Sequence, residues 1–177
     1  KILYAVTYIN DSVNGNFNFK SIFKKINKLK KKEILIDFDG TINDCFKRYY
    51  FLHIKICKML KLNSINYKKF IKLKKDKIKN IDLFEAPLNI KKKYLKIWIK
   101  NIEKNNFLKK DKIFIGVKKK LNQLSKKNIL YLNSYRCNKK NFYNQIHKFK
   151  IEKYFSKIFF ISNRRYSSKK EFFKDYK

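Results

Sequence analysis

Acidic side chains, glycine and proline are scarce in this sequence of 177 residues. It has 13 Asp and Glu against 47 Lys and Arg, which gives a net charge of +34, and it contains only 3 Gly and 1 Pro. No apolar run approaches the ~18 residues that a membrane-spanning helix needs. The first residues lack the long apolar region and the small-residue cleavage site of a signal peptide. We therefore expect no membrane-spanning segment.

The excess of positive charge has two explanations. A nucleic-acid partner would account for it, because cationic side chains release counterions from a phosphate backbone. Biased base composition would also account for it, since the enriched residues Lys, Asn, Ile, Phe and Tyr all have A/T-rich codons. The lysines are spread through every segment, whereas a nucleic-acid footprint is usually clustered. We favour bias as the main source and expect non-specific, salt-sensitive binding to polyanions in either case.

Cysteine is also rare, and its distribution argues against disulfide and zinc sites. The three residues, Cys45, Cys57 and Cys137, are odd in number and match no zinc-ligand spacing. Reduced thiols are typical of the cytosol, so we predict a cytoplasmic protein. Hydrophobic residues make up 44% of the chain, which is enough to bury a core.

The most informative stretch joins an apolar run to two carboxylates. Residues 34–36 are apolar and predict a buried strand at 33–37. Asp37 and Asp39 come at its end, followed by a Gly-Thr turn at 40–41. The strand therefore delivers both carboxylates to the edge of the sheet where open α/β folds bind their ligands. This spacing suits phosphoryl transfer, in which one carboxylate attacks phosphorus and the other carries a proton.

A long helical segment separates this strand from the next one. Amphipathic helices are predicted at about 45–61, 67–80 and 89–105. Together they exceed a simple crossover connection, so we interpret them as an inserted helical lid. His53 is expected to pack inside this lid, since no ligand partner is evident at helical spacing around it. Trp98 is expected in the same core.

The rest of the chain alternates between strands and helices. A strand at 128–133 ends at Ser134, and a helix follows at 139–149. A strand at 157–161 leads through a polar loop to a helix that begins near Lys169. At the other end of the chain, a strand at 2–9 and an amphipathic helix near 22–29 contain no assignable motif.

These motifs together resemble the haloacid dehalogenase-like hydrolases. The apolar strand followed by Asp-x-Asp-Gly-Thr at 37–41 resembles the family's first signature, and Ser134 matches the second. Lys169, or its neighbour Lys170, matches the third, a lysine at the start of a helix. Residues 114–117 resemble the family's return from cap to core. The resemblance implies an α/β fold, with a Rossmann-like parallel sheet core and an inserted α-helical cap of the phosphoglycolate phosphatase type.

The resemblance also implies a division of the chain. Residues 1–32 form an unassigned extension of a strand and a helix, 33–44 and 112–177 form the core, and 45–111 form the cap. The family's fourth signature, an acidic pair after a further strand, is absent, so we expect a piece of a longer protein that is incomplete at its C-terminus. In the family that strand packs beside the first motif strand. The sheet is therefore expected to lack a central neighbour there.

Site roles follow from the resemblance. Asp37 is the expected nucleophile, which forms an aspartyl-phosphate, and Asp39 the general acid and base. Ser134 and Lys169 are expected to bind the phosphate. Mg²⁺ is the expected cofactor, with the Asp37 side chain and the Asp39 main-chain carbonyl as ligands. Arg136 is expected either to touch substrate or cap, or to pair with an acid of the cap.

The implied function is that of a Mg²⁺-dependent phosphatase of small phosphomonoesters. Two alternatives stay open. One is a basic, nucleic-acid-associated protein with a non-catalytic core of this type, and the other is a polynucleotide end phosphatase. Because the acidic loop is missing, the 177-residue piece by itself is expected to be slow or inactive. The sequence predicts no substrate and no oligomeric state.

Overall fold

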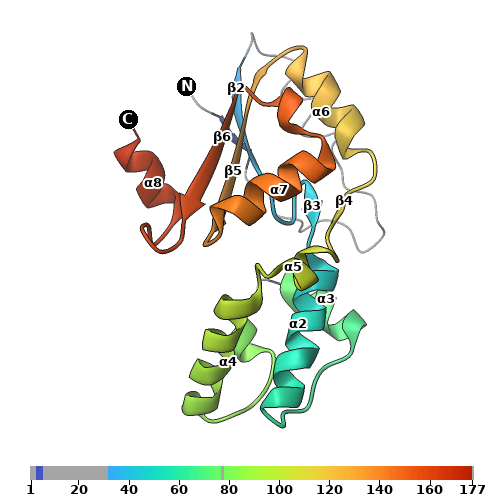
Figure 1. Ribbon diagram of the computed structural model, residues 1–177, viewed down its shortest axis with the longest axis vertical. Helices are drawn as coiled ribbons and strands as arrows, with labels where there is room; N and C mark the ends of the chain where they lie inside the picture. The colour runs from blue at the N-terminus through green and yellow to red at the C-terminus, as the bar shows by residue number, and fades with distance from the viewer. Residues whose placement is uncertain (1–2, 6–31, 77, 177) are drawn as a thin grey trace. The chain divides into compact units, whose positions relative to one another are not determined.

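The computed structural model describes residues 3–5, 32–76 and 78–176 (Figure 1). The chain divides into two compact units, unit 1 with Lys1–Asn43 and Ile113–Lys177, and unit 2 with Asp44–Lys112. The helix expected near 22–29 and most of the strand expected at 2–9 lie outside the described residues. Within the described ranges, every helix is too short or too polar to span a bilayer.

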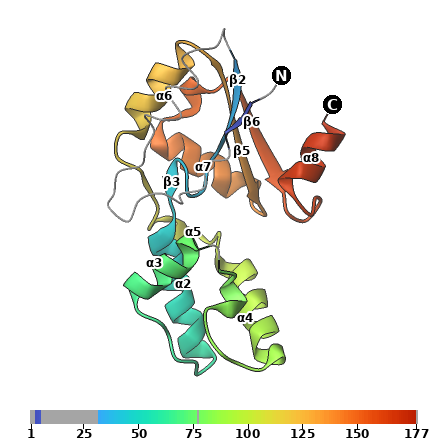
Figure 2. The ribbon, with the colours of Figure 1, turned by 180° about the vertical axis from the view of Figure 1, so that it is seen from behind.

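Unit 1 is built on a four-stranded parallel sheet. Its strands are β1 (Leu3–Ala5), β2 (Glu33–Asp37), β5 (Ile129–Arg136) and β6 (Lys157–Ser162), in the order β1-β2-β5-β6. All three neighbouring pairs are parallel. Helices cover the sheet, as Figures 1 and 2 show from opposite sides. The predicted α/β fold with a parallel sheet core is therefore confirmed.

Strand β1 corrects one expectation. The motif strand β2 was predicted to lack a neighbour on one side, but β1 pairs with it in parallel, with Leu3 opposite Ile34 and Ala5 opposite Ile36. Strand β5 pairs with β2 as well. Strand β2 therefore has a neighbour on both sides.

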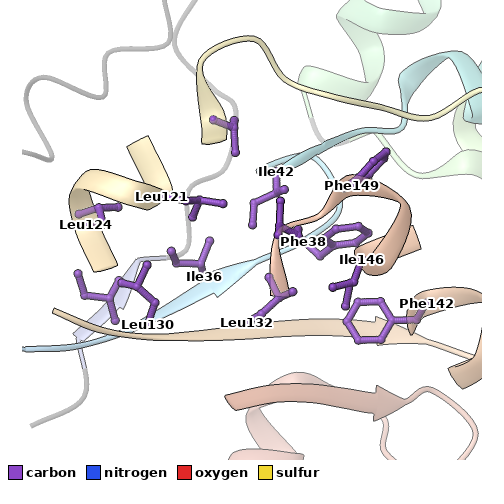
Figure 3. Close-up of a cluster of buried hydrophobic side chains, with 13 residues drawn as sticks. Ile36, Phe38, Ile42, Leu121, Leu124, Leu130, Leu132, Phe142, Ile146 and Phe149 are labelled. Atoms are coloured by element: carbon purple, nitrogen blue, oxygen red, sulfur yellow. The ribbon is translucent and has the colours of Figure 1, made fainter. Parts of the chain in front are cut away.

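Side chains alternate between the two faces of the sheet. Ile34 and Ile36 of β2 join the larger buried cluster, together with residues of α6 (Val117–Ser125) and α7 (Lys139–Phe149). Figure 3 shows this cluster, where Leu121 and Leu124 of α6 lie on the same side of the strands as Ile36. Each such buried aliphatic side chain stabilises the fold by about 1.5–3 kcal/mol. This packing fixes the strands that end at the polar edge described below.

The opposite face is covered by the last helix, α8 (Lys169–Asp175). Leu35, Phe159 and Ile161 form a smaller buried cluster there, against which Phe172 and Phe173 pack. Ser168 caps the helix, because its side chain accepts a hydrogen bond from the main-chain nitrogen of Glu171. The cap and the aromatic contacts together fix where α8 starts, and hence the position of Lys169.

Unit 2 is helical. It contains α2 (Phe46–Met59), α3 (Tyr67–Lys75), the short 3-10 helix η1 (Asn80–Asp82), α4 (Leu88–Asn101) and α5 (Asn105–Leu108). Short strands β3 (Asn43–Asp44) and β4 (Lys112–Ile113) pair where the chain passes from one unit to the other and back. A second 3-10 helix, η2 (Glu152–Tyr154), belongs to unit 1.

Two predicted helices of unit 2 are too long. The one expected at 67–80 ends at Lys75, because Lys74 Nζ donates to the carbonyl of Ile78 and to Asn80 Oδ1 and so stabilises a turn there. The one expected at 89–105 is split into α4 and α5. Polar side chains that bond to main-chain groups favour such breaks over continued helix.

His53 is buried in unit 2, as predicted, but it has partners that the sequence analysis overlooked. Its Nδ1 lies 2.9 Å from Tyr94 Oη, and Cys57, one helical turn later, places Sγ 3.7 Å from the ring nitrogens. Burial lowers the pKa of His53 to about 4 and raises that of Cys57 to about 11. Burial also raises the pKa of Tyr94. The three groups are therefore neutral at pH 7 and form a polar cluster inside an apolar core.

Candidate active site

The candidate site lies at the carboxyl edge of the sheet. Strand β2 ends at Asp37, which pairs in register with Asn133 of β5. Strand β5 was predicted to end at Ser134, but it continues to Arg136, and Ser134 pairs with Phe160 of β6. The extension happens because Ser134 and Arg136, although polar, are 1% and 2% exposed and find partners at this edge.

A tight turn follows β2. The main-chain nitrogen of Phe38 donates to the carbonyl of Asn133 over 3.0 Å and so prolongs the ladder by one residue. The Phe38 carbonyl then accepts from the main-chain nitrogens of Ile42 (3.0 Å) and Asn43 (2.9 Å). Gly40 has φ of +79°, in the left-handed region that favours glycine. The Asp-Gly-Thr sequence therefore places Asp39 at the tip of the edge, beside Asp37.

Asp37 is paired with a cation from α8. Lys169 Nζ lies 2.5 Å from Asp37 Oδ1, which also accepts from the main-chain nitrogen of Phe38 over 2.8 Å. Burial raises the pKa of Asp37, and the opposite charge of Lys169 acts in the other direction. Within the part of the chain that the structure describes, no hydrogen bond reaches Asp37 Oδ2. This oxygen is therefore the one that could accept a ligand.

Asp39 is held by three side chains. Arg136 donates through Nη2 to Asp39 Oδ1 (2.5 Å) and through Nε to Oδ2 (2.6 Å), which is a bidentate contact. Asn43 Nδ2 donates to Oδ1 over 2.8 Å, and Ser134 Oγ to Oδ2 over 3.3 Å. Charge-assisted bidentate pairs of this kind are strong and geometrically specific. The second carboxylate is therefore fixed in orientation.

Arg136 thus has a partner other than those predicted. It was expected to touch substrate or cap, or to pair with an acid of the cap, but its partner is Asp39 of the same edge. Gln145 of α7 accepts from Nη1 over 2.5 Å. The sequence analysis missed Gln145, although one signal was present. It is a polar residue within the apolar stripe of α7, and it is only 5% exposed.

The four residues predicted to form the site are brought together at one edge. Asp37 contacts Lys169, and Asp39 contacts Ser134. The sequence left open whether Lys169 or Lys170 faces the site. Lys169 makes the contact with Asp37, whereas Lys170 is exposed.

The donor atoms at this edge are oxygens, which suit Mg²⁺. Asp37 Oδ2 and the main-chain carbonyl of Asp39 are the groups that could hold the ion. No cluster of three or more His, Cys, Asp or Glu side chains occurs among the residues that the structure describes. Mg²⁺ is commonly bound by one or two carboxylates, with waters and substrate phosphate as the other ligands. The described residues therefore fit a Mg²⁺ ion of this sparse type.

A pocket of about 260 Å³ lies elsewhere on unit 1. Its lining comes from the amino-terminal halves of the strands and from α8, and consists of Glu33, Leu35, Tyr131, Lys157, Phe159, Phe173 and Tyr176. None of the residues of the carboxyl edge contributes to it. We assign the chemistry to the carboxyl edge, because that is where the paired charges are.

Comparison with known proteins agrees with this arrangement. A family model described as haloacid dehalogenase-like hydrolase matches residues 34–170, well over half of the chain. The matched range includes Asp37, Asp39, Ser134 and Lys169. A search of curated proteins returned no match.

Solved structures show the same fold. A haloacid dehalogenase-like hydrolase from Streptococcus pneumoniae is 15% identical, with a TM-score of 0.58, over 73% of this chain and 61% of that one. A candidate phosphatase from Clostridium difficile is 17% identical, with a TM-score of 0.63, over 84% and 69%. A subfamily IA hydrolase from Geobacter sulfurreducens is 15% identical, with a TM-score of 0.54, over 78% and 65%. The chain thus spans about two thirds of the length of these proteins.

Proposed function

Because the chain belongs to the haloacid dehalogenase-like hydrolases, we propose that it is a phosphatase of small phosphomonoesters that works through an aspartyl-phosphate. The observation that carries this proposal is the pair of differently held carboxylates, Asp37 and Asp39. One presents an oxygen to a ligand, and the other is fixed beside it. Such an arrangement supports nucleophilic attack by the first and proton transfer by the second.

Asp37 Oδ2 attacks phosphorus, the bond from phosphorus to the ester oxygen breaks, and the alcohol leaves with a proton from Asp39. Water then attacks the aspartyl-phosphate and gives its proton to Asp39, so that inorganic phosphate and free Asp37 are regenerated. Lys169 offsets the negative charge shared by Asp37 and the phosphoryl group. Ser134 Oγ, which lies 3.3 Å from Asp39 Oδ2 without substrate, would turn to donate its hydrogen bond to a phosphoryl oxygen instead. The atoms and charges balance over the cycle.

Mg²⁺ is the cofactor that we propose for this site. It would be held by the Asp37 carboxylate and the Asp39 carbonyl, and it would reduce the repulsion between an anionic nucleophile and an anionic phosphate. Lys169 also reduces this repulsion, because its Nζ lies 2.5 Å from Asp37 Oδ1 and offsets the charge of the carboxylate.

Unit 2 is proposed to be the helical cap, the part that selects the substrate. The boundaries predicted for the cap, 45–111, and those of unit 2, Asp44–Lys112, differ by one residue at each end. We propose a cytoplasmic location, because the odd number and the spacing of the cysteines suit reduced thiols.

Hydrolysis of p-nitrophenyl phosphate tests the proposal. We expect the full-length protein, which serves as the wild type in this and the following tests, to release p-nitrophenol in the presence of Mg²⁺. Asp37→Asn should lose at least 10³-fold of this activity, because the amide is a poor nucleophile. Asp175→Asn, in the last turn of α8, is the matched control and should keep wild-type activity. Equal inactivity of wild type and Asp37→Asn would refute the enzyme and favour the non-catalytic, nucleic-acid-associated alternative.

The net charge of +34 favours one second candidate, a polynucleotide end phosphatase. It would use the same carboxylates on a terminal phosphate of a nucleic acid. Comparing kcat/KM for a small sugar phosphate with that for a 3′-phosphorylated oligonucleotide, at 50 and 200 mM salt, separates the two. A preference for the oligonucleotide that disappears at high salt would support the second candidate.

A further inference from the structure

Arg136 is an unusual residue for its position at the end of a buried strand. It is 2% exposed, and it forms an ion pair with the carboxylate of Asp39. A guanidinium taken out of water is costly unless its donors are satisfied. Here Nε and Nη2 donate to Asp39 and Nη1 donates to Gln145, so all three nitrogens are engaged.

The surroundings fix the guanidinium in place. Its central carbon lies 5.1 Å from the ring centroid of Phe38 and 5.7 Å from that of Phe142. These rings meet edge to face, with centroids 5.5 Å apart, in the core below the site (Figure 3). Gln145, from the same helix as Phe142, holds the far end. Arg136 is therefore a rigid part of the core that projects two donors onto Asp39.

The consequence for Asp39 is a fixed direction. Each of its oxygens accepts from Arg136 and from one other side chain, Asn43 on Oδ1 and Ser134 on Oδ2. An aspartate on a tight turn would otherwise sample several rotamers. A proton-transferring group must be held within tenths of an ångström of its working position, and this is the task of neighbouring residues.

We infer that Arg136 is the positioning residue of the acid and base step, and that Gln145 and the two aromatic rings position Arg136 in turn. This inference rests on the proposed function. Arg136 does not touch substrate in this scheme, and it acts only through Asp39. A lysine could not replace it, because a single ammonium nitrogen lacks the rigid planar fork that reaches Asp39 through Nε and Nη2 and Gln145 through Nη1.

The test separates proton transfer from every other step by the choice of leaving group. p-Nitrophenolate is a good leaving group and needs no proton in order to leave. The alkoxide of an alkyl phosphate such as 2-glycerophosphate is a poor leaving group and must be protonated as it leaves. kcat/KM reports only the steps up to formation of the aspartyl-phosphate, so it isolates protonation of the leaving group. We expect Arg136→Gln and Arg136→Lys to lower kcat/KM for 2-glycerophosphate by about 10²-fold and for p-nitrophenyl phosphate by less than about 10-fold.

Three further variants make the result decisive. Gln145→Leu should change the ratio of the two kcat/KM values in the same direction but less. The double variant Asp39→Asn/Arg136→Gln should have the same ratio as Asp39→Asn alone, because the carboxylate through which Arg136 acts is then absent. Arg165→Gln, an exposed arginine of the loop before α8, should behave as wild type. Circular dichroism spectra identify any variant that fails to fold.

Equal losses on both esters would overturn the inference, because a structural role affects all steps alike. A wild-type ratio in Arg136→Lys would also overturn it, since charge alone would then suffice. If the wild type hydrolyses neither ester, the proposed function fails, and this inference fails with it. If instead the wild type hydrolyses both esters and the Arg136 variants keep the wild-type ratio of the two kcat/KM values, only the inference about Arg136 is refuted.

Discussion

Mild acid should destabilise unit 2 through His53. The ring is fully buried, and burial lowers its pKa from 6.5 to about 4. As the pH falls, the unfolded chain therefore binds the proton before the folded chain does. The contribution of the neutral ring to folding is fully present above pH 6.5 and is lost progressively as the pH falls from 6.5 to 4.

The size of the effect follows from the two pKa values. One pKa unit corresponds to about 1.4 kcal/mol, so a difference of roughly 2.5 units gives a maximal loss on the order of 3 kcal/mol. At pH 5, where most carboxylates are still ionised, the loss is on the order of 2 kcal/mol. Tyr94 and Cys57 face the ring, and neither carries the negative charge that would stabilise a protonated imidazole.

The only tryptophan of the chain reports on this unit. Trp98 is 6% exposed and stacks on Tyr94 with 6.0 Å between ring centroids. Urea unfolding followed by Trp fluorescence should therefore show a midpoint about 1 M lower at pH 5 than at pH 7, for an m-value of about 2 kcal/mol/M.

Two variants isolate the effect. His53→Gln keeps a polar partner for Tyr94 but does not titrate, so its midpoint should change much less between pH 7 and pH 5. His147, the other histidine, has a side chain that is 84% exposed, and His147→Gln should behave as wild type. The reasoning is refuted if His53→Gln loses as much stability as the wild type over this range.

Three further predictions concern the site and the sheet. Lys169→Met should lower kcat/KM for p-nitrophenyl phosphate by about 10²–10³-fold and Lys170→Met by less than about 2-fold, since only Lys169 contacts Asp37. Removal of Mg²⁺ with EDTA should abolish hydrolysis, and added Mg²⁺ should restore it; hydrolysis that persists in EDTA would contradict the proposed cofactor. Deleting residues 1–31 removes β1 and should lower the free energy of unfolding by about 2–3 kcal/mol, at about 1 kcal/mol for each lost main-chain hydrogen bond. Urea unfolding followed by circular dichroism measures this free energy. An unchanged value would show that β1 adds nothing to the stability of the sheet.

Elements with a strong local signal could be predicted from the sequence. Strand β2 was expected at 33–37 and helix α7 at 139–149, and both have those bounds. In β2 an uninterrupted apolar run is bounded by charges, and in α7 the apolar residues recur with helical spacing. The type and the bounds of both elements depend on their own residues, so they can be predicted from a single segment of the sequence.

Elements that depend on distant partners could not be predicted in the same way. Strand β5 continues past Ser134 because Asp39, nearly a hundred residues earlier, accepts hydrogen bonds from Ser134 and Arg136. Nothing in the local sequence shows that these polar residues are buried. Strand β1 likewise pairs with β2 across a long stretch of chain. The positions of the site residues could be predicted from motifs, but the pairing of Arg136 with Asp39 could not.

The two carboxylate–cation pairs differ in a way that fits the proposed chemistry. Asp37 and Lys169 keep 26% and 34% of their side-chain surfaces exposed, whereas Asp39 and Arg136 keep 19% and 3%. An exposed ion pair is held by about 1 kcal/mol or less and can reorganise when an anion arrives. A buried, bidentate pair is far costlier to disrupt. Lys169 can therefore shift from Asp37 towards an incoming phosphate, while Arg136 keeps Asp39 fixed throughout. In the proposed mechanism, the nucleophile Asp37 needs a cation that can move towards the phosphate, and Asp39 needs a cation that stays in place.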